Sequence, residues 1–175
     1  MVDAYVAMGS NLGDREAHLA AATHALRSRP DVRVVAVSTV YETAPLGPPP
    51  QGPYLNAALR LRTQLAPRAL LACLLEIEAS RGRQRSSGRW SARTLDLDLL
   101  FYGSLVLDEP GLCVPHPALH ERAFVLVPLC ELAPQLVHPR LGASVEELAR
   151  KVRDSGSVVA FRSGSSARIP EQVDE

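Results

Sequence analysis

A short run of alternating leucines and aspartates constrains this chain more than any other stretch. Between residues 94 and 100, the leucines at 95, 97 and 99 alternate with Asp96 and Asp98. Successive side chains of a β-strand point to opposite faces, and alternate residues lie roughly 7 Å apart. The pattern therefore predicts a strand with one apolar and one acidic face. Two carboxylates at this separation can reach one divalent ion or a close pair of ions, and they suit hard cations such as Mg²⁺.

An arginine-rich segment precedes this strand. Its arginines are spaced by glycine and serine, and they are Arg81, Arg83, Arg85, Arg89 and Arg93. Arginine binds phosphate through a planar, bidentate fork. Each feature alone is more often a solvated surface, since Asp-x-Asp is common on the open face of antiparallel sheets. The acidic pair and the basic segment together favour a site for metal and polyphosphate.

The order of expected elements predicts an α+β fold. Strands are expected at 2–8, 32–41, 54–61 and from 94 onward, with helices at 15–29 and 67–80. This β-α-β-β-α-β order is that of a ferredoxin-like sheet, which is antiparallel with two helices on one face. The other face would be free for a site that includes Asp96 and Asp98. A helix at 121–129, a helix at 145–152 and an edge strand at 158–161 are expected to follow.

Two segments that connect expected helices and strands are candidates for a functional role. Residues 42–53 contain five prolines and two glycines, so they predict a long loop that is either a lid or a passive connection. Residues 9–14 form a turn of small residues between a strand and a helix, where phosphate can bind. This turn lacks the full P-loop pattern, so a structural role is favoured there.

Composition narrows the function classes. The 175 residues suit one domain, expected at 1–162, followed by a disordered tail at 163–175. A formal net charge of zero argues against a nucleic-acid partner. The start lacks a signal-peptide layout, and no apolar run approaches the ~20 residues of a membrane helix. A cytoplasmic protein without a membrane partner is expected, and no dedicated dimer seam is evident, which favours a monomer.

Six ordered motifs resemble one known family. They are YVAMGSNL at 5–12, YETAPLGP at 41–48, YLNAA at 54–58, RWSARTLDLD at 89–98, VPH at 114–116 and RAF at 122–124. The chain resembles the 6-hydroxymethyl-7,8-dihydropterin pyrophosphokinases of folate biosynthesis over residues 4–134. Any one motif is weak, whereas the ordered set is highly specific.

The resemblance implies an activity and an architecture. The expected reaction transfers pyrophosphate from ATP to the hydroxymethyl group of the pterin and releases AMP. The expected fold is a three-layer αβα arrangement with helices on both faces of the sheet. Asp96 and Asp98 would hold two Mg²⁺ ions, and Asp96 or a metal is the nearest candidate to deprotonate the hydroxymethyl group.

The resemblance also implies roles for individual residues. The expected catalytic residues are Arg83, Arg93, Asp96 and Asp98. The expected ATP-binding residues are Glu78, Arg85, Trp90, Leu99, His116 and Arg122. The expected pterin-binding residues are Thr43, Leu46, Tyr54, Asn56 and Phe124. Ser91, Ala44 and Pro117 depart from the family pattern, and Pro117 weakens the expected ATP contact beside it.

Two alternatives remain open at this point. The same β-α-β-β-α-β order occurs in RNA-binding domains whose sheet stacks bases, but the acidic face and the lack of an aromatic RNA-binding signature count against that reading. A metal-dependent phosphohydrolase would use the same aspartates with an activated water. Pterin-dependent formation of AMP would separate the transferase from the hydrolase.

Overall fold

The computed structural model describes residues 1–45, 51–83, 92–153 and 156–162. Its strands are β1 (Val2–Ser10), β2 (Val32–Val37), β3 (Tyr41–Thr43), β4 (Tyr54–Thr63), β5 (Asp96–Tyr102), β6 (Leu107–Glu109), β7 (Leu112–Val114) and β8 (Val158–Ala160). Its helices are α1 (Arg15–Arg27), α2 (Pro67–Ser80), the short 3₁₀ helix η1 (Leu119–Glu121), α3 (Ala123–Leu132) and α4 (Val145–Val152). Leu46, Arg85, Trp90, Ser91 and the tail expected at 163–175 lie outside the described residues.

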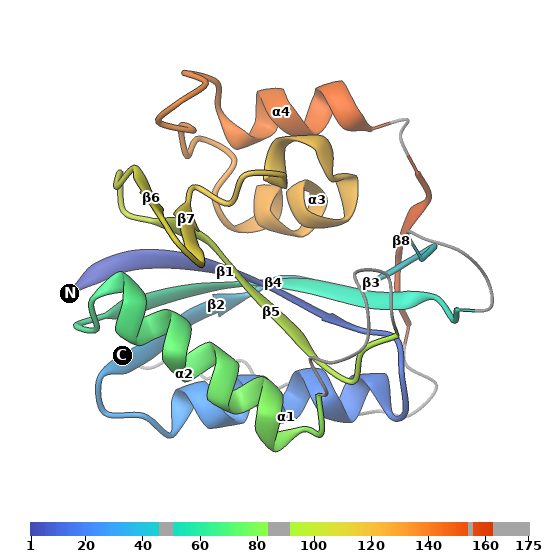
Figure 1. Cartoon of the computed structure of the whole chain (residues 1–175). Helices are drawn as coiled ribbons and strands as arrows, with labels where there is room; N and C mark the ends of the chain where they lie inside the picture. Colours follow the sequence, from blue (N-terminus) through green and yellow to red (C-terminus); the bar gives the residue numbers. More distant parts are fainter. Residues whose placement is uncertain (46–50, 84–91, 154–155, 163–175) are drawn as a thin grey trace, which may run out of the picture.

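The main sheet is antiparallel and has the strand order β5-β1-β4-β3-β8, with β2 also paired to β4 (Figure 1). The central β1 lies between β4 and β5, as the ferredoxin-like arrangement requires. The single strand expected at 32–41 is divided into β2 and β3. Ser38 lies at the break, where its Oγ accepts a hydrogen bond of 2.8 Å from the backbone N–H of Ala58.

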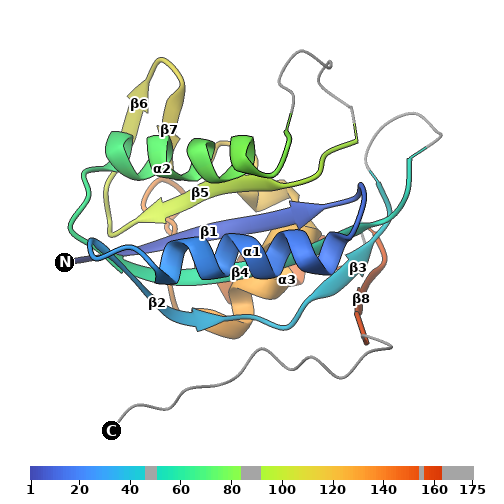
Figure 2. The same cartoon turned by 90° about the horizontal axis from the view of Figure 1, so that it is seen from below.

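Helices cover both faces of this sheet. Helices α1 and α2 lie side by side across one face (Figure 2), and α3 and α4 lie on the other (Figure 1). The three-layer αβα expectation is therefore confirmed. The expectation of a free second face, drawn from the element order, is wrong because α3 packs against β4 and β1 on that face. The non-polar residues of α3 supply the burial that this packing requires.

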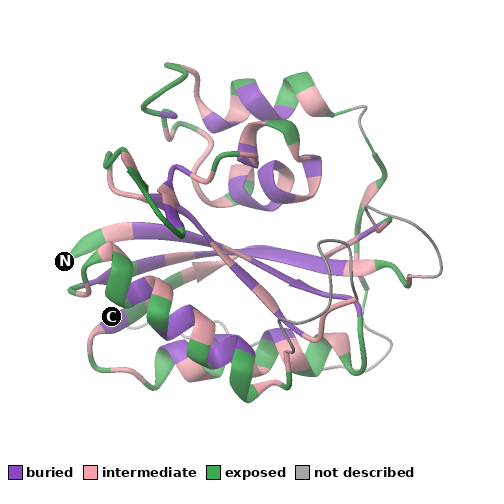
Figure 3. Ribbon diagram, viewed as in Figure 1, coloured by how far each residue is buried: buried purple, intermediate pink, exposed green. Residues whose placement is uncertain are grey.

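The alternation of side chains along the strands produces two cores. Leu97, Leu99 and Val6 belong to the core beneath α1 and α2. Tyr5 and Phe101 belong to the core beneath α3 and α4. Figure 3 shows the resulting buried band along the centre of the sheet.

Local signals explain where the helices begin. Asp14 caps α1 by accepting a hydrogen bond of 3.0 Å from the backbone N–H of Ala17. Pro67 opens α2 at a position where its missing N–H costs nothing. Ser144 and Glu147 form a reciprocal capping box at α4. In the part of the chain that the structure describes, no helix has both the length and the apolar character needed to cross a membrane.

Candidate active site

The register of three strands brings the acidic pair to the site. Gly9 in β1 pairs with Asp96 on one side and with Asn56 on the other, and Ala7 pairs with Asp98. Directly paired residues point to the same face of a sheet. Asp96, Asp98 and Asn56 therefore share the face that α3 covers, and the small residues of β1 leave open space between them.

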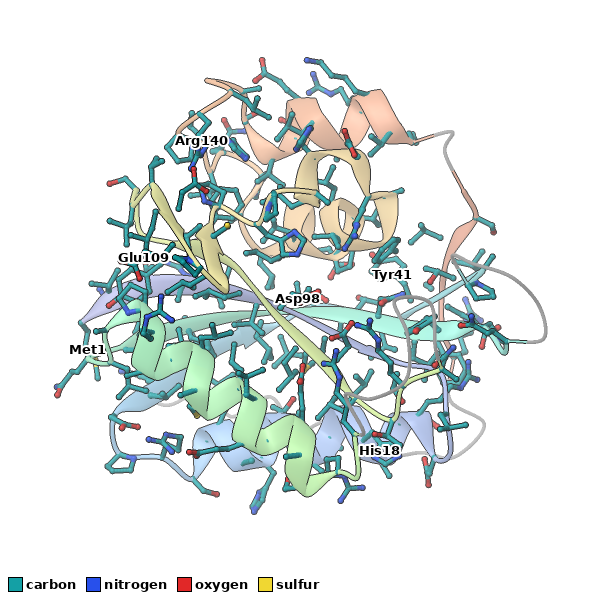
Figure 4. All side chains as sticks on the ribbon, in the orientation of Figure 1. Met1, His18, Tyr41, Asp98, Glu109 and Arg140 are labelled. Carbon is teal, nitrogen blue, oxygen red and sulfur yellow. The ribbon has the colours of Figure 1, made fainter. Side chains whose placement is uncertain are left out.

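A cavity of about 120 Å³ fills this space. Its floor is the strand row just described, and β3 and α3 supply its sides. Figure 4 shows Asp98 between the sheet and α3. The side chains that line it and were expected at the site are Thr43, Tyr54, Asn56, Arg93, Asp96, Asp98, Arg122 and Phe124. The cavity thus has aromatic walls, one amide and one charged end.

The amide end is held by a buried hydrogen bond. The Asn56 Nδ2 donates to the Thr43 Oγ1 at 2.6 Å, and both residues are buried. This bond orients the side-chain amide, since its nitrogen is already committed to Thr43. Burial raises the pKa of the Tyr54 hydroxyl nearby, so Tyr54 is neutral at physiological pH. A flat heterocycle with hydrogen-bonding edges fits such a cavity.

Two arginines neutralise Asp96. The Arg83 Nη1 lies 2.6 Å from the Asp96 Oδ1, and the Arg93 Nη1 lies 2.7 Å from the Oδ2. Both carboxylate oxygens thus accept charge-assisted hydrogen bonds. The two guanidinium groups thus offset the negative charge of Asp96 in the ligand-free site.

Asp98 lies in a different electrostatic setting. Burial, and next the negative charge of Asp96, raise its pKa to about 7, while the guanidinium of Arg122 opposes that shift. A buried carboxyl beside a second carboxyl is stabilised when a cation arrives. Among the described residues, no group of three or more His, Cys, Asp or Glu side chains forms a metal cluster. The two aspartates suit a hard ion that takes its other ligands from phosphate and water.

Glu78 connects this site to α2. Its Oε1 accepts a hydrogen bond of 2.7 Å from the backbone N–H of Leu97 and forms an ion pair with Arg83. The residue is 1% exposed. Glu78 therefore links helix α2, strand β5 and the guanidinium that holds Asp96.

Comparison with known proteins decides the family. Residues 5–134 match the family described as 7,8-dihydro-6-hydroxymethylpterin-pyrophosphokinase (HPPK). The chain belongs to the HPPK family. It is an ATP-dependent pyrophosphokinase that carries out the pyrophosphoryl transfer of folate biosynthesis.

Curated relatives agree along most of the chain. It is 45% identical over 156 residues to a 2-amino-4-hydroxy-6-hydroxymethyldihydropteridine pyrophosphokinase of Methylorubrum extorquens, covering 89% of this chain and 97% of that protein. A protein of the same description from Pseudomonas aeruginosa is 48% identical over 135 residues, covering 77% of this chain and 83% of that protein. The recognition from ordered motifs is confirmed.

Solved structures confirm the fold. A crystal structure of an HPPK-DHPS in complex with substrates matches with a TM-score of 0.68 at 12% identity, covering 88% of this chain and 44% of that chain. A Plasmodium falciparum HPPK-DHPS triple mutant with STZ-DHP also gives 0.68 at 13% identity, covering 86% and 43%. The chain thus spans less than half the length of these two proteins.

Three further residues expected at the ATP site, His116, Leu99 and Glu78, differ in how far they are buried. The His116 backbone N–H donates to the Leu100 carbonyl at 2.9 Å, which places this histidine beside β5. Burial, and next Arg122, lower its pKa to about 4. Leu99 is 5% exposed and its side chain packs in the core on the opposite face, so only its backbone is available to a ligand on this side. Glu78 does not line the cavity either.

Sequence reasoning missed two contributors to the site. Gly9 lines the cavity, and a Cβ there would lie 3.0 Å from the Asn56 Oδ1. Asn11 bonds to the backbone of Arg93. The small-residue turn at 9–14 was the available signal, but its residues were assigned to turn formation.

Proposed function

We propose that the cavity binds the pterin ring of 6-hydroxymethyl-7,8-dihydropterin. Tyr54 and Phe124 offer aromatic faces to the ring, and each such stack contributes on the order of 1 kcal/mol. Asn56 and Thr43, held by their mutual hydrogen bond, offer polar atoms to its edge. Leu46, also expected here, lies outside the described residues. The observation that carries the proposal is this cavity, in which aromatic and amide walls adjoin a carboxylate pair.

ATP would bind with its phosphates against the charged end of the cavity. Arg83 and Arg93 are within reach of this region because both already contact Asp96. Arg122 and His116 would add contacts to the phosphate oxygens, and Arg122 also lies with its guanidinium carbon 5.8 Å from the centroid of the Phe124 ring. Arg85, Trp90, Glu78 and Leu99 remain predicted ATP neighbours.

Asp96 and Asp98 would hold two Mg²⁺ ions. The residues fit these ions because two carboxylates share one end of the cavity and because a cation would relieve the cost of ionising the half-buried Asp98. Bound Mg²⁺ would neutralise phosphate charge and orient the phosphoryl group for displacement. The arginines now paired with Asp96 would then be available to the phosphates.

The proposed transfer is an in-line displacement at the β-phosphorus. The hydroxymethyl oxygen of the pterin forms a bond to that phosphorus, and the bond from it to the oxygen bridging the α- and β-phosphates breaks. AMP leaves with that bridging oxygen, and the hydroxyl proton passes to solvent water. Phosphoryl transfer needs alignment and charge neutralisation more than covalent help. Tyr54, Asn56 and Phe124 would align the nucleophile, and Arg83 and Arg93 would stabilise the developing charge.

The test is formation of AMP from MgATP with and without 6-hydroxymethyl-7,8-dihydropterin. We expect AMP only when the pterin is present, and we expect EDTA to abolish it. Formation of ADP would show attack at the γ-phosphorus instead. Hydrolysis of ATP without pterin would favour a phosphohydrolase site.

A matched pair of variants assigns the reaction to the acidic pair. We expect Asp96→Ala to lower kcat by at least about a thousandfold, in line with the loss of a charge-stabilising group. Asp108→Ala is the control, because Asp108 lies in β6 and pairs with Arg140 away from the cavity. Full turnover by Asp96→Ala would refute the metal assignment.

The proposed working form of the protein is a monomer in the cytoplasm, where ATP is abundant.

A further inference from the structure

The turn after β1 contacts the backbone of Arg93 in two ways. The backbone N–H of Asn11 donates to the Arg93 carbonyl at 3.0 Å. The backbone N–H of Arg93 in turn donates to the Asn11 Oδ1 at 2.7 Å. Asn11 is 7% exposed, so both bonds are shielded from water. Two bonds to the same residue fix both its position and its orientation.

Arg93 depends on such support because regular structure does not provide it. Residues 92–95 belong to no helix or strand, so no backbone ladder holds them. The Arg93 guanidinium nevertheless reaches Asp96 at 2.7 Å and lines the cavity. The backbone from which this side chain extends is held by Asn11.

Asn11 also contacts the end of the proline-rich segment. Its Nδ2 lies 3.4 Å from the Gly52 carbonyl and 3.4 Å from the Gln51 Oε1. These residues lead directly into Tyr54 at the start of β4. The buried side chain of Asn11 thus contacts two segments: the one that leads into Tyr54 and the one that leads into Asp96.

We propose that Asn11 is a positioning residue for the transfer reaction. It holds the Arg93 backbone so that the guanidinium faces Asp96, and it couples this placement to the segment that precedes Tyr54. The inference rests on the proposed role of Arg93 in stabilising the reacting phosphates. Misplacing a group by about 1 Å can cost about a hundredfold in rate.

The experiment is a kinetic double-mutant cycle with Asn11→Ala and Arg93→Ala, measured as kcat and as KM for the pterin. We expect Asn11→Ala to lower kcat by about ten- to a hundredfold and to raise the pterin KM. In the Arg93→Ala background, the effect of Asn11→Ala on kcat should disappear, because the group it positions is gone. Asn11→Asp keeps an oxygen for the Arg93 N–H and should recover much of the lost kcat.

Two controls separate positioning from folding. Leu12→Ala changes an exposed residue of the same turn and should leave kcat unchanged. Thermal unfolding of each variant confirms that kcat is measured on folded protein. Should Asn11→Ala fail to fold, Asn11→Ser takes its place, since its shorter side chain also loses the three side-chain contacts of Asn11.

Three results would overturn the proposal. One is a folded Asn11→Ala variant with unchanged kcat, which would make Asn11 a purely structural turn residue. Another is a double mutant in which the two losses of kcat multiply, which would place the action of Asn11 elsewhere. The third is an Arg93→Ala variant with unchanged kcat, which would remove the role of Arg93 in the proposed function as well, and so differs from the first two.

Discussion

Gly9 and Asn56 face each other across β1 and β4, and a Cβ added to Gly9 would lie 3.0 Å from the Asn56 Oδ1. The same Cβ would lie 3.6 Å from the Tyr54 Cδ1. Because the Asn56 amide is already bonded to Thr43, it has little freedom to move away. The absence of a side chain at Gly9 is thus a condition for the shape of the cavity.

Gly9→Ala should therefore weaken pterin binding. We expect the pterin KM to rise about tenfold, the equivalent of about 1.4 kcal/mol, because the methyl group displaces the Asn56 side chain. Steady-state kinetics with each substrate varied in turn would measure this. The KM for ATP is the internal control and should stay within about twofold, and an equal rise in both values would contradict the assignment of this end to the pterin.

Arg83 and Arg93 should differ in what their loss does to stability. Both Arg83→Ala and Arg93→Ala should lower kcat, by about a hundredfold or more. Arg83→Ala should also destabilise the fold by roughly 3 kcal/mol, because it breaks the ion pair between Arg83 and the buried carboxylate of Glu78. Arg93→Ala leaves Asp96 paired with Arg83, and its side chain is more exposed, at 28% against 12%.

Urea unfolding of the two arginine variants would measure this difference. Arg62→Ala, at a residue whose side chain is 54% exposed in an ion pair with Asp3, is the control for loss of a surface arginine. Equal unfolding free energies for Arg83→Ala and Arg93→Ala would show that Glu78 does not depend on Arg83.

Asp98→Asn should stabilise the ligand-free protein while it removes activity. The folded pKa of Asp98, about 7, lies above its ordinary value of 3.8. The folded protein therefore binds this proton more tightly than the unfolded chain, and the stability it contributes is lost as the pH rises from about 4 to about 7. The amide that replaces the carboxyl carries no charge. The unfolding free energy of the variant should therefore rise relative to that of the wild type as the pH increases from about 4 to about 7.

The gain should reach the order of a few kcal/mol above about pH 7. Denaturant unfolding of both proteins in EDTA, at several pH values, would measure it. A difference in stability that stays constant with pH would contradict the raised pKa of Asp98.

His116 should bind ATP without being charged. Its Nδ1 accepts a hydrogen bond of 3.2 Å from the backbone N–H of Ala118, which places the ring proton on Nε2. Its pKa of about 4 keeps it neutral at physiological pH. An Nε2–H can donate to a phosphate oxygen in that state, so His116→Ala should weaken ATP binding about tenfold, as expected for one hydrogen bond to a charged group.

Calorimetry at pH 6 and pH 8 would test this neutral role. The ratio of ATP affinities between wild type and His116→Ala should be the same at both values. A ratio that grows at pH 6 would indicate an imidazolium. The histidine should also act on stability with a sign opposite to that of Asp98: its folded pKa lies below 6.5, so its contribution is lost as the pH falls from about 6.5 to about 4.

Local patterns in the sequence predicted the acidic strand well. The alternation of leucines with Asp96 and Asp98 is a property of consecutive residues, and β5 places its leucines in the core and its aspartates at the cavity. The break between β2 and β3 could not be predicted in this way. It depends on Ser38 meeting the N–H of Ala58 on another strand, and a run of β-branched residues carries no sign of that contact.

The surroundings of the site required long-range information. Glu78 was expected near ATP, yet it contacts the Leu97 N–H, nineteen residues away, and the guanidinium of Arg83. The packing of α3 on the second face of the sheet could not be predicted either, because a helical pattern at 121–129 does not indicate which strands the helix contacts. Family resemblance supplied roles, but it did not supply these contacts.

The pairing of Asp96 with two guanidinium groups has a consequence for the ligand-free enzyme. Arg83 and Arg93 offset the charge of Asp96. The raised pKa of Asp98 allows this carboxyl to hold a proton, and so to be uncharged, near neutral pH. The charges of these two aspartates can therefore be balanced in the ligand-free fold without magnesium or nucleotide. We therefore expect the ligand-free enzyme to stay folded when magnesium or nucleotide is scarce and to resume catalysis when both return.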